Sequence, residues 1–392
     1  MEKTLPKGWK WTWLGEVSDI NPQKPELPPD SQVTFLPMSA ISDGGEIVEG
    51  QVKPFVEVQK GYTGFIENDV LFAKITPCME NGKGTIARNL INAVGFGSTE
   101  FHVIRPSKDL LSDFIFRYLS LKHIRKFAES NMTGSAGQKR VPESFLKKLQ
   151  IPLPPLPTQR KIVEILEEAD NLRKLRRQAD EKMKDLTPSL FVEMFGDPAT
   201  NPKGWEITSI SEICNLVNGK AFKPADWSET GIPIIRIQNL NDDTKPFNYF
   251  DGNIEQKYCV KNDDVLLSWS GTPGTSFGAH IWKRGDGVLN QHIFRVELLE
   301  DKILKKIFVS IVNRKLYELI NKAHGGVGLS HITKGRLENI KIPLPPLPLQ
   351  QEFAERVREI EAEKERQAES KKKLDDLFNS LMQRAFNGEL VA

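Results

Sequence analysis

One sequence unit occurs twice in this chain. Pro6-Lys7-Gly8-Trp9 recurs as Pro202-Lys203-Gly204-Trp205, and the heptapeptide Ile-Pro-Leu-Pro-Pro-Leu-Pro of residues 151–157 recurs letter for letter at 342–348. Further matches follow the second motif in an unbroken register. A colinear series of this kind indicates internal duplication, so we expect two copies of one structural unit.

The two copies agree at their ends and differ in their middles. Asp69-Val70-Leu71 aligns only loosely with Asp264-Val265-Leu266, whereas the flanking motifs match closely. Each copy therefore consists of a long mixed block, a proline-rich hinge and a charged helix. A pair of units that keep their ends and change their middles indicates one scaffold that carries two different surfaces.

The composition is that of a soluble protein with two or three domains. The 392 residues are 39% apolar and 27% charged, with a net charge of +2, so any nucleic-acid surface must be a local patch. We find no apolar run long enough for a membrane helix and no signal-peptide core in residues 1–19. The three cysteines form no CxxC pair or Cys/His cluster, which argues against disulfide and zinc scaffolds and fits a reducing cytoplasm.

The segment after each hinge is predicted to be a long helix. We expect Thr158 to cap the first helix, which runs to Phe195, and Pro188 to kink its last turns. Apolar or small residues recur with the three-and-four spacing of a coiled-coil seam. The seam consists of Ile162, Ile165, Ala169, Leu172, Ala179, Met183, Leu186 and Leu190.

The second predicted helix runs from Leu349 to about Asn387, and Gly388 marks its end. Its centre, residues 361–373, is almost entirely charged. A lone helix this polar is not stable in water, so we expect the two helices to pack against each other, with a pseudo-two-fold axis between the repeats.

Strand-like runs and Gly/Asn/Asp turns fill the long blocks, and each block closes with one helical stretch. The predicted fold class is therefore α+β: two pseudo-two-fold-related mixed domains separated by two long antiparallel coiled-coil helices. The expected boundaries are 1–157 for the first domain, 158–196 for the first helix, 197–348 for the second domain and 349–392 for the second helix and tail.

No catalytic motif is present. Residues 80–84 lack the upstream glycine and the Ser/Thr of a P-loop, and GxGxxG, GxSxG and HExxH do not occur. The Asn-Pro dipeptides at residues 21 and 201 do not extend to the Asn/Asp-Pro-Pro-aromatic motif of amino-methyltransferases. We therefore expect that this chain is not an enzyme by itself.

The first candidate site is the segment 71–84. A strand delivers Lys74 and Thr76, and a turn delivers Asn81 and Lys83. Asn pairs bidentately with adenine, and Lys donates to guanine or phosphate. The alternative is a solvated hairpin with ordinary turn residues.

The second candidate site is in the second copy, where segments 266–274 and 235–239 carry polar side chains of the types that contact phosphates or base edges. These residues are Arg236, Gln238, Asn239, Ser270 and Thr272. Trp269 is assigned to the core rather than to base stacking. The alternative is an ordinary polar strand end.

The third candidate is the glycine-rich loop that precedes each hinge, at 133–140 and 324–331. Glycines allow the backbone to approach a ligand closely. The candidate contacts are Gln138, Lys139 and Arg140 in the first copy and Ser330 and His331 in the second. A flexible connecting loop is the alternative, although both copies keep the glycines.

Two variable α+β blocks and two repeated helices, each entered through Leu-Pro-Pro-Leu-x-x-Gln, resemble one family over the whole chain. It is the specificity subunit of type I restriction–modification systems. The resemblance rests on residues 151–159 and 342–350, the Pro-Lys-Gly-Trp motif, and segments 69–84 and 264–274.

The resemblance implies that each block is a target recognition domain for one half of a bipartite, asymmetric DNA site. It implies that the helices set the half-site spacing and bind two methyltransferase subunits, which use S-adenosylmethionine to methylate adenine. Motor/nuclease subunits that need ATP and Mg would complete the complex, and this chain would hold no cofactor or metal. We assign partner contacts on the helices to Gln159, Ile162, Leu172, Gln350, Phe353, Val357 and Lys364, with residues 361–373 as a further candidate docking surface.

Three alternatives stay open. A stand-alone bipartite DNA-binding regulator would bind its site without a methyltransferase. A coiled-coil scaffold would show no salt-dependent DNA binding. An enzyme with unrecognised motifs would act by itself with a cofactor.

Overall fold

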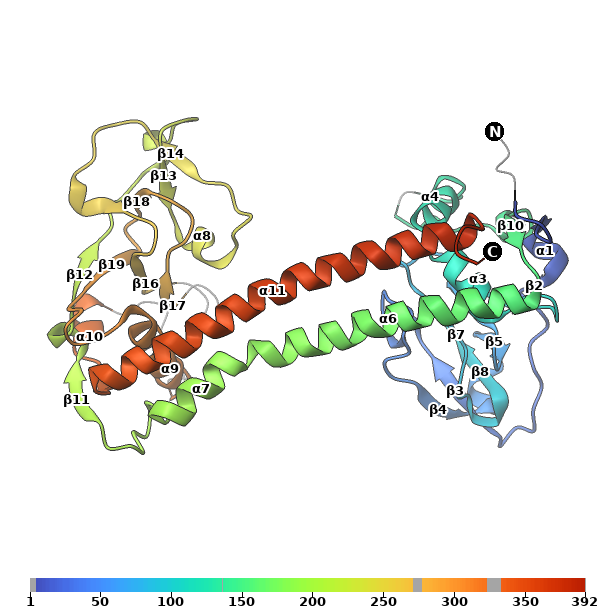
Figure 1. Cartoon of the computed structure of the whole chain (residues 1–392), viewed down its shortest axis with the longest axis horizontal. Helices are drawn as coiled ribbons and strands as arrows, with labels where there is room; N and C mark the ends of the chain where they lie inside the picture. The colour runs from blue at the N-terminus through green and yellow to red at the C-terminus, as the bar shows by residue number, and fades with distance from the viewer. Residues whose placement is uncertain (1–4, 136, 271–276, 323–332, 392) are drawn as a thin grey trace. The chain divides into compact units, whose positions relative to one another are not determined.

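The computed structural model describes residues 5–135, 137–270, 277–322 and 333–391, with the side chains of 320–322 left out. The chain divides into two compact units, one of residues Met1–Arg177 and Glu369–Ala392 and one of Gln178–Ala368. Both boundaries fall inside long helices that Figure 1 labels α6 and α11. Each unit therefore contains the beginning of one long helix and the end of the other.

The first unit contains two four-stranded sheets. In one, the strand order is β2-β9-β6-β7, and all pairs are antiparallel. In the other, the order is β4-β3-β8-β5, and β3 and β8 are parallel. The strands are β2 (Ser18–Ile20), β3 (Gln32–Leu36), β4 (Gln51–Pro54), β5 (Thr63–Ile66), β6 (Val70–Ala73), β7 (Gly84–Ile86), β8 (Val94–Gly97) and β9 (Phe101–Pro106).

Short helices cover the first of these sheets. α3 and α4 supply Phe114, Ile115 and Ile124 to the core that also holds Val70 and Ile104 of the sheet. The helices are α1 (Leu14–Val17), α2 (Phe55–Val58), α3 (Ser112–Leu119), α4 (Lys122–Ser130) and α5 (Glu143–Lys147), with 3₁₀ turns η1 (Met38–Ala40) and η2 (Ile91–Ala93).

The two repeated motifs pair with each other in each copy. β1 (Lys10–Trp13), which follows the first Pro-Lys-Gly-Trp motif, forms an antiparallel ribbon with β10 (Gln150–Leu153) of the hinge. β11 (Glu206–Ser209) and β20 (Lys341–Leu344) form the same ribbon in the second unit. The ribbon joins the start of each block to its end, which explains why these motifs are repeated together.

The second unit repeats the sheet topology of the first. Its sheets have the orders β12-β19-β16-β17 and β14-β13-β18-β15, and β13 and β18 are parallel. The strands are β12 (Cys214–Asn218), β13 (Ile232–Ile235), β14 (Asn248–Phe250), β15 (Cys259–Val260), β16 (Val265–Ser268), β17 (Gly278–Ile281), β18 (Gly287–Leu289) and β19 (Ile293–Leu298). The helices are α8 (Ile237–Asn241), α9 (Lys305–Lys322) and α10 (Lys334–Glu338), with η3 (Ile210–Glu212), η4 (Pro224–Asp226) and η5 (Gln256–Tyr258).

The long helices are α6 (Leu156–Lys184), α7 (Leu186–Phe195) and α11 (Leu347–Phe386). The expected cap at Thr158 is wrong by three residues, since α6 begins at Leu156 and Pro155 is the residue before it. The helix starts at Leu156 because a proline is tolerated in the first turn, where its missing N–H needs no partner. The expected kink is present: α6 ends one residue before Asp185, and Pro188 cannot donate to the carbonyl four residues earlier. Gly388 follows α11 with a φ of 77°, as expected for a helix end.

The predicted seam is correct near the helix ends and wrong in between. In the first unit, Ile162 and Ala169 of the predicted seam are buried in one core with Phe378 and Met382 of α11. Leu166 is buried there in place of the predicted Ile165, which is half-buried. In the second unit, Leu190 and Phe191 of α7 pack in one core with Phe353 and Val357 of α11. Leu172 and Leu186, however, are 47% and 44% exposed. The cores of the two units, rather than a continuous seam, therefore bury the apolar helix positions.

Candidate nucleic-acid interface

In the first unit, two predicted segments far apart in sequence lie side by side. The end of β6 pairs with the start of β9, Ala73 opposite Phe101. The backbone N–H of Thr76 donates to the carbonyl of Lys139 (3.1 Å), and that of Val141 donates to the carbonyl of Lys74 (2.9 Å). The turn 74–83 and the loop 133–141 thus form one surface, which we call the first polar edge.

The turn of the first polar edge is held by its own backbone. Asn81 N–H donates to the carbonyl of Pro77 (3.0 Å), and Lys83 N–H donates to the carbonyl of Cys78 (2.9 Å). Gly82 has a φ of 92°, a conformation that favours glycine. The side chain of Asn81 is exposed, and Lys83 is half-buried with its Nζ 3.4 Å from the carbonyl of Met38. The turn therefore carries an exposed amide and a half-buried ammonium on a fixed backbone.

Arg125 of α4, which the sequence analysis missed, holds this turn. Its Nη1 donates to the carbonyl of Met79 (2.9 Å), and its Nη2 donates to the carbonyl of Gly82 (2.8 Å). Burial lowers the pKa of the guanidinium to about 10. A signal for it was available, because Arg125 lies on the same helix face as the buried Leu121 and Ala128.

The loop of the first polar edge contributes one paired and two exposed side chains. Arg140 donates from Nε (2.9 Å) and Nη2 (2.8 Å) to the two carboxylate oxygens of Glu100. This bidentate bond is the main cause that lowers the pKa of the Glu100 carboxyl. Arg140 is therefore ion-paired within the edge, but its side chain is still 41% exposed, so its DNA contact stays a prediction, as do those of the exposed Gln138 and Lys139. Thr76 is also engaged, since its hydroxyl donates to Glu80 Oε1 (2.9 Å).

The far end of the loop is anchored by a buried histidine. His102 Nε2 lies 2.8 Å from the carbonyl of Val141, so it carries the proton, and Nδ1 accepts from the Asn21 amide (3.0 Å). The same amide donates to Glu143 (2.7 Å). Burial, assisted by the positive charge of Lys74, lowers the pKa of His102. The loop is therefore fastened at its base by a neutral imidazole.

The second unit has its polar residues at the corresponding ends of its strands. Ile235 at the end of β13 lies beside Leu289 of β18, and Ser268 of β16 lies opposite Ile293 of β19. Segments 236–238 and 290–292, with Ser270, therefore meet at the edge that the turn 74–83 occupies in the first unit. We call this surface the second polar edge.

A pocket of about 330 Å³ opens on the second polar edge. Aromatic and amide side chains line it together, and the Arg236 guanidinium lies 5.1 Å from the centre of the Trp227 ring. The polar or aromatic lining residues are Phe222, Trp227, Arg236, Gln238, Asn290, Gln291 and His292. The sequence analysis identified Arg236 and Gln238 and missed the three residues between β18 and β19, because only strand pairing brings them to this edge.

Asn239 does not belong to the surface. It is 1% exposed, its Oδ1 accepts from the backbone of Arg236 (3.1 Å), and its Nδ2 donates to the carbonyls of Lys245 and Pro246. The predicted base contact at Asn239 is corrected to a structural role. Ser270 is half-buried, and Trp269 packs against the core as expected. The predicted contacts Thr272, Ser330 and His331 lie outside the described residues.

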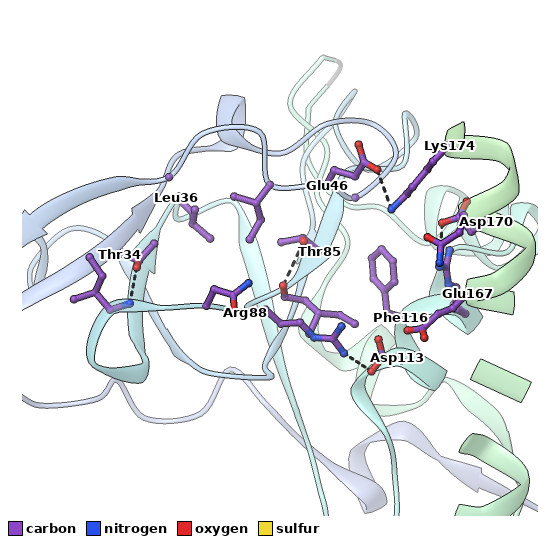
Figure 2. Close-up of a pocket in the computed structure, with 18 of the residues that line it drawn as sticks. Thr34, Leu36, Glu46, Thr85, Arg88, Asp113, Phe116, Glu167, Asp170 and Lys174 are labelled. Atoms are coloured by element: carbon purple, nitrogen blue, oxygen red, sulfur yellow. Dashed lines mark hydrogen bonds and ion pairs between the residues drawn. The ribbon is translucent and has the colours of Figure 1, made fainter. Parts of the chain in front are cut away.

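Between the first domain and the start of α6 lies a pocket of about 680 Å³ in which opposite charges are paired (Figure 2). Lys174 of α6 bonds to Glu46 (3.0 Å), and Arg88 bonds to Asp113 across the floor near Phe116. The Lys174–Glu46 pair joins the domain to its helix, whereas the Arg88–Asp113 pair lies within the domain. The pocket is therefore a join between two elements rather than an anion site.

The predicted partner contacts on the helices are mostly buried inside the units. Ile162, Phe353 and Val357 belong to the cores, and Gln159 and Gln350 are 0% exposed. We correct these five residues to internal packing and hydrogen bonding, because a partner cannot reach them in this structure. Leu172 is exposed and Lys364 is half-buried, so both stay predictions.

The described residues show neither a metal-binding cluster nor a membrane-spanning helix. No group of three or more His, Cys, Asp or Glu side chains is arranged to hold a metal ion there. No helix in the same part of the chain has the length and apolar character that spanning a membrane requires.

Similar proteins point to one family. The model of the type I restriction modification DNA specificity domain matches residues 6–184 and again 202–376. The specificity subunit of the type I restriction enzyme EcoEI of Escherichia coli is 44% identical over 163 residues, which are 41% of this chain and 27% of that protein. The chain therefore covers about a quarter of this relative. The MjaVIII specificity subunit of Methanocaldococcus jannaschii is 23% identical over 95% of this chain and 92% of its own length.

Solved structures agree on the fold. A chain from work on complex assembly and conformational transition of the type I R-M system superposes with a TM-score of 0.70, at 23% identity, over 99% of this chain and 100% of that one. The HsdS subunit of Thermoanaerobacter tengcongensis superposes with a TM-score of 0.52, at 22% identity, over 99% of each chain. The duplicated family match covers most of the sequence, and this chain belongs to the family of type I restriction–modification DNA specificity domains.

Proposed function

We propose that this chain is the DNA-reading subunit of a type I restriction–modification complex. Each domain reads one half of a bipartite, asymmetric DNA site through its polar edge. One observation carries the proposal: both units end the same strands at the same edge and place different polar side chains there. A shared scaffold with different amide and basic residues is what two different half-sites require.

The amide and basic side chains of the two edges suit the major groove. Asn81 and Lys83 in the first edge, and Gln238 in the second, are residue types that bond base edges. The net charge of +2 is small for a DNA-binding protein. Phosphate contacts by partner subunits therefore add to the affinity, which falls steeply with salt.

The helices carry the assembly role. Two methyltransferase subunits dock on exposed helix surface, for which Leu172, Lys364 and residues 361–373 are the candidates. Those subunits bring S-adenosylmethionine and methylate adenine, and motor/nuclease subunits bring the ATP and Mg chemistry. This chain binds no cofactor, catalyses no step itself and works in the cytoplasm, where the host DNA is.

A base-modification map of host DNA with the gene intact and deleted tests this function. We expect the loss of one methyladenine motif that consists of two short half-sites around a fixed spacer. An unchanged map in a strain that expresses the partner methyltransferase contradicts the proposal. A regulator or scaffold role would then be separated by salt-dependent DNA binding of the purified chain.

A further inference from the structure

Each copy buries one glutamine where its long helix begins. Gln159 is 0% exposed in the first turns of α6. Its Nε2 donates to the carbonyls of Asp109 (2.8 Å) and Pro154 (2.9 Å), and its Oε1 accepts from the N–H of Leu111 (2.9 Å). One amide group thus binds the domain, the hinge and the helix together.

The second copy repeats this arrangement bond for bond. Gln350 is also 0% exposed. Its Nε2 donates to the carbonyls of Lys302 (3.0 Å) and Pro345 (2.8 Å), and its Oε1 accepts from the N–H of Leu304 (2.9 Å). The partners are backbone groups, so the arrangement does not depend on the side chains that differ between the copies.

An amide is the side-chain group that suits this position. Its NH₂ supplies two donors and its oxygen accepts, which matches two carbonyls and one N–H. The three partner groups come from the loop before α3 or α9 and from the hinge. Because a buried backbone group without a partner is costly, the three bonds strongly favour one direction of the helix relative to its own domain.

We propose that Gln159 and Gln350 are positioning residues that fix the direction in which each long helix leaves its recognition domain, and thereby restrict the spacer length between the half-sites. This inference rests on the proposed function. Neither glutamine touches DNA, so neither selects bases. Their effect is confined to the distance and rotation at which the two half-sites are read.

A small change of angle where a long helix begins moves the far end of that helix by a large distance. α6 has 29 residues, which span about 44 Å at 1.5 Å per residue. A change of about 5° at its start displaces its far end by about 4 Å, which is close to the rise of one base pair of about 3.4 Å. A subunit that accepts one spacer length must therefore hold this angle to within a few degrees.

The test selects binding sites from a randomised duplex DNA pool, using the full chain purified from its host together with the proteins that it assembles with. The wild type is expected to give two half-site motifs at one spacer length. Gln159→Met and Gln350→Met are expected to keep both motifs and to spread the spacer over at least one base pair on either side. The matched control is Gln351→Met, which changes an exposed glutamine in the first turn of α11.

The outcomes distinguish a failure of the positioning role from a failure of the proposed function. A single spacer length in both Met variants, with both motifs retained, overturns the positioning role. If a Met variant loses a half-site motif because its domain unfolds, Gln159→Asn decides. This variant keeps the amide on a side chain one carbon shorter, and a motif that returns with a broadened spacer supports the role. A motif that returns with one length, or stays lost, overturns it. If the wild type yields no motif, the proposed function itself fails.

Discussion

The two polar edges occupy the same place in the same topology and are built differently. In the first domain the edge is a closed turn, which Arg125 holds through two backbone carbonyls, with the Asn81 amide exposed. In the second domain the edge is an open pocket with Gln238 and Gln291 among its lining residues. Under the proposed function, the sheets fix where DNA is read, and the loops between fixed strand ends decide what is read.

The largest expected effect comes from removing the two polar side chains of the first turn, the exposed Asn81 and the half-buried Lys83. Asn81→Ala together with Lys83→Ala is expected to weaken discrimination at the first half-site by about 2–6 kcal/mol, since one good base contact is worth about 1–3 kcal/mol. Discrimination at the second half-site is expected to stay unchanged. Binding competition between duplexes altered in one half-site measures both effects, and unchanged discrimination at both halves contradicts the assignment.

The next effect comes from the support of that turn. Arg125→Met leaves the carbonyls of Met79 and Gly82 without their donors, at about 1–3 kcal/mol for each buried group. We expect the first half-site to be read about tenfold less selectively, with the second unaffected. Arg125→Lys, which keeps one donor and the charge, is expected to recover part of the selectivity.

The control for Arg125 lies on the same helix. Lys122→Met removes one positive charge from α4 at an exposed position, and we expect it to leave the selectivity unchanged. An equal loss in Arg125→Met and Lys122→Met would show that charge alone matters and that the turn needs no support.

The third comparison uses the same residue type in both domains. Asn239→Ala removes the hydrogen bonds of a buried amide and is expected to destabilise the second domain by about 1–3 kcal/mol. Asn81→Ala removes an exposed amide and is expected to leave stability unchanged. Urea denaturation of the two variants measures the difference, and a loss of stability in Asn81→Ala that matches Asn239→Ala would contradict the contrast between the edges.

Local patterns predicted the duplication, the α+β class, the kink near Pro188 and the end of the second helix. They could not predict burial that arises from contacts between distant segments. Gln159 follows a repeated motif and was assigned to a partner, because the sequence does not show that the loop at Asp109 approaches it. Leu172 fits the heptad spacing but is exposed, since the cores of the units take up only the apolar positions near the helix ends. The pocket-lining residues at 290–292 depend on strand pairing in the same way.

The smallest effect expected is the pH response of the first edge. Burial lowers the pKa of His102 below its usual 6.5, so the unfolded chain binds the proton more readily than the native one. Native stability is therefore complete above about pH 6.5 and falls as the pH drops from there through the lowered pKa. The nearby carboxyls of Glu100 and Glu143 do not titrate in this range, because hydrogen bonds lower their pKa values below 4.5.

Melting temperatures between pH 5 and pH 8 test this expectation. Those of the wild type are expected to fall toward acid, and those of His102→Gln are expected to fall less. Equal slopes in the wild type and His102→Gln would show that the imidazole is not the group that couples acid to the base of the loop.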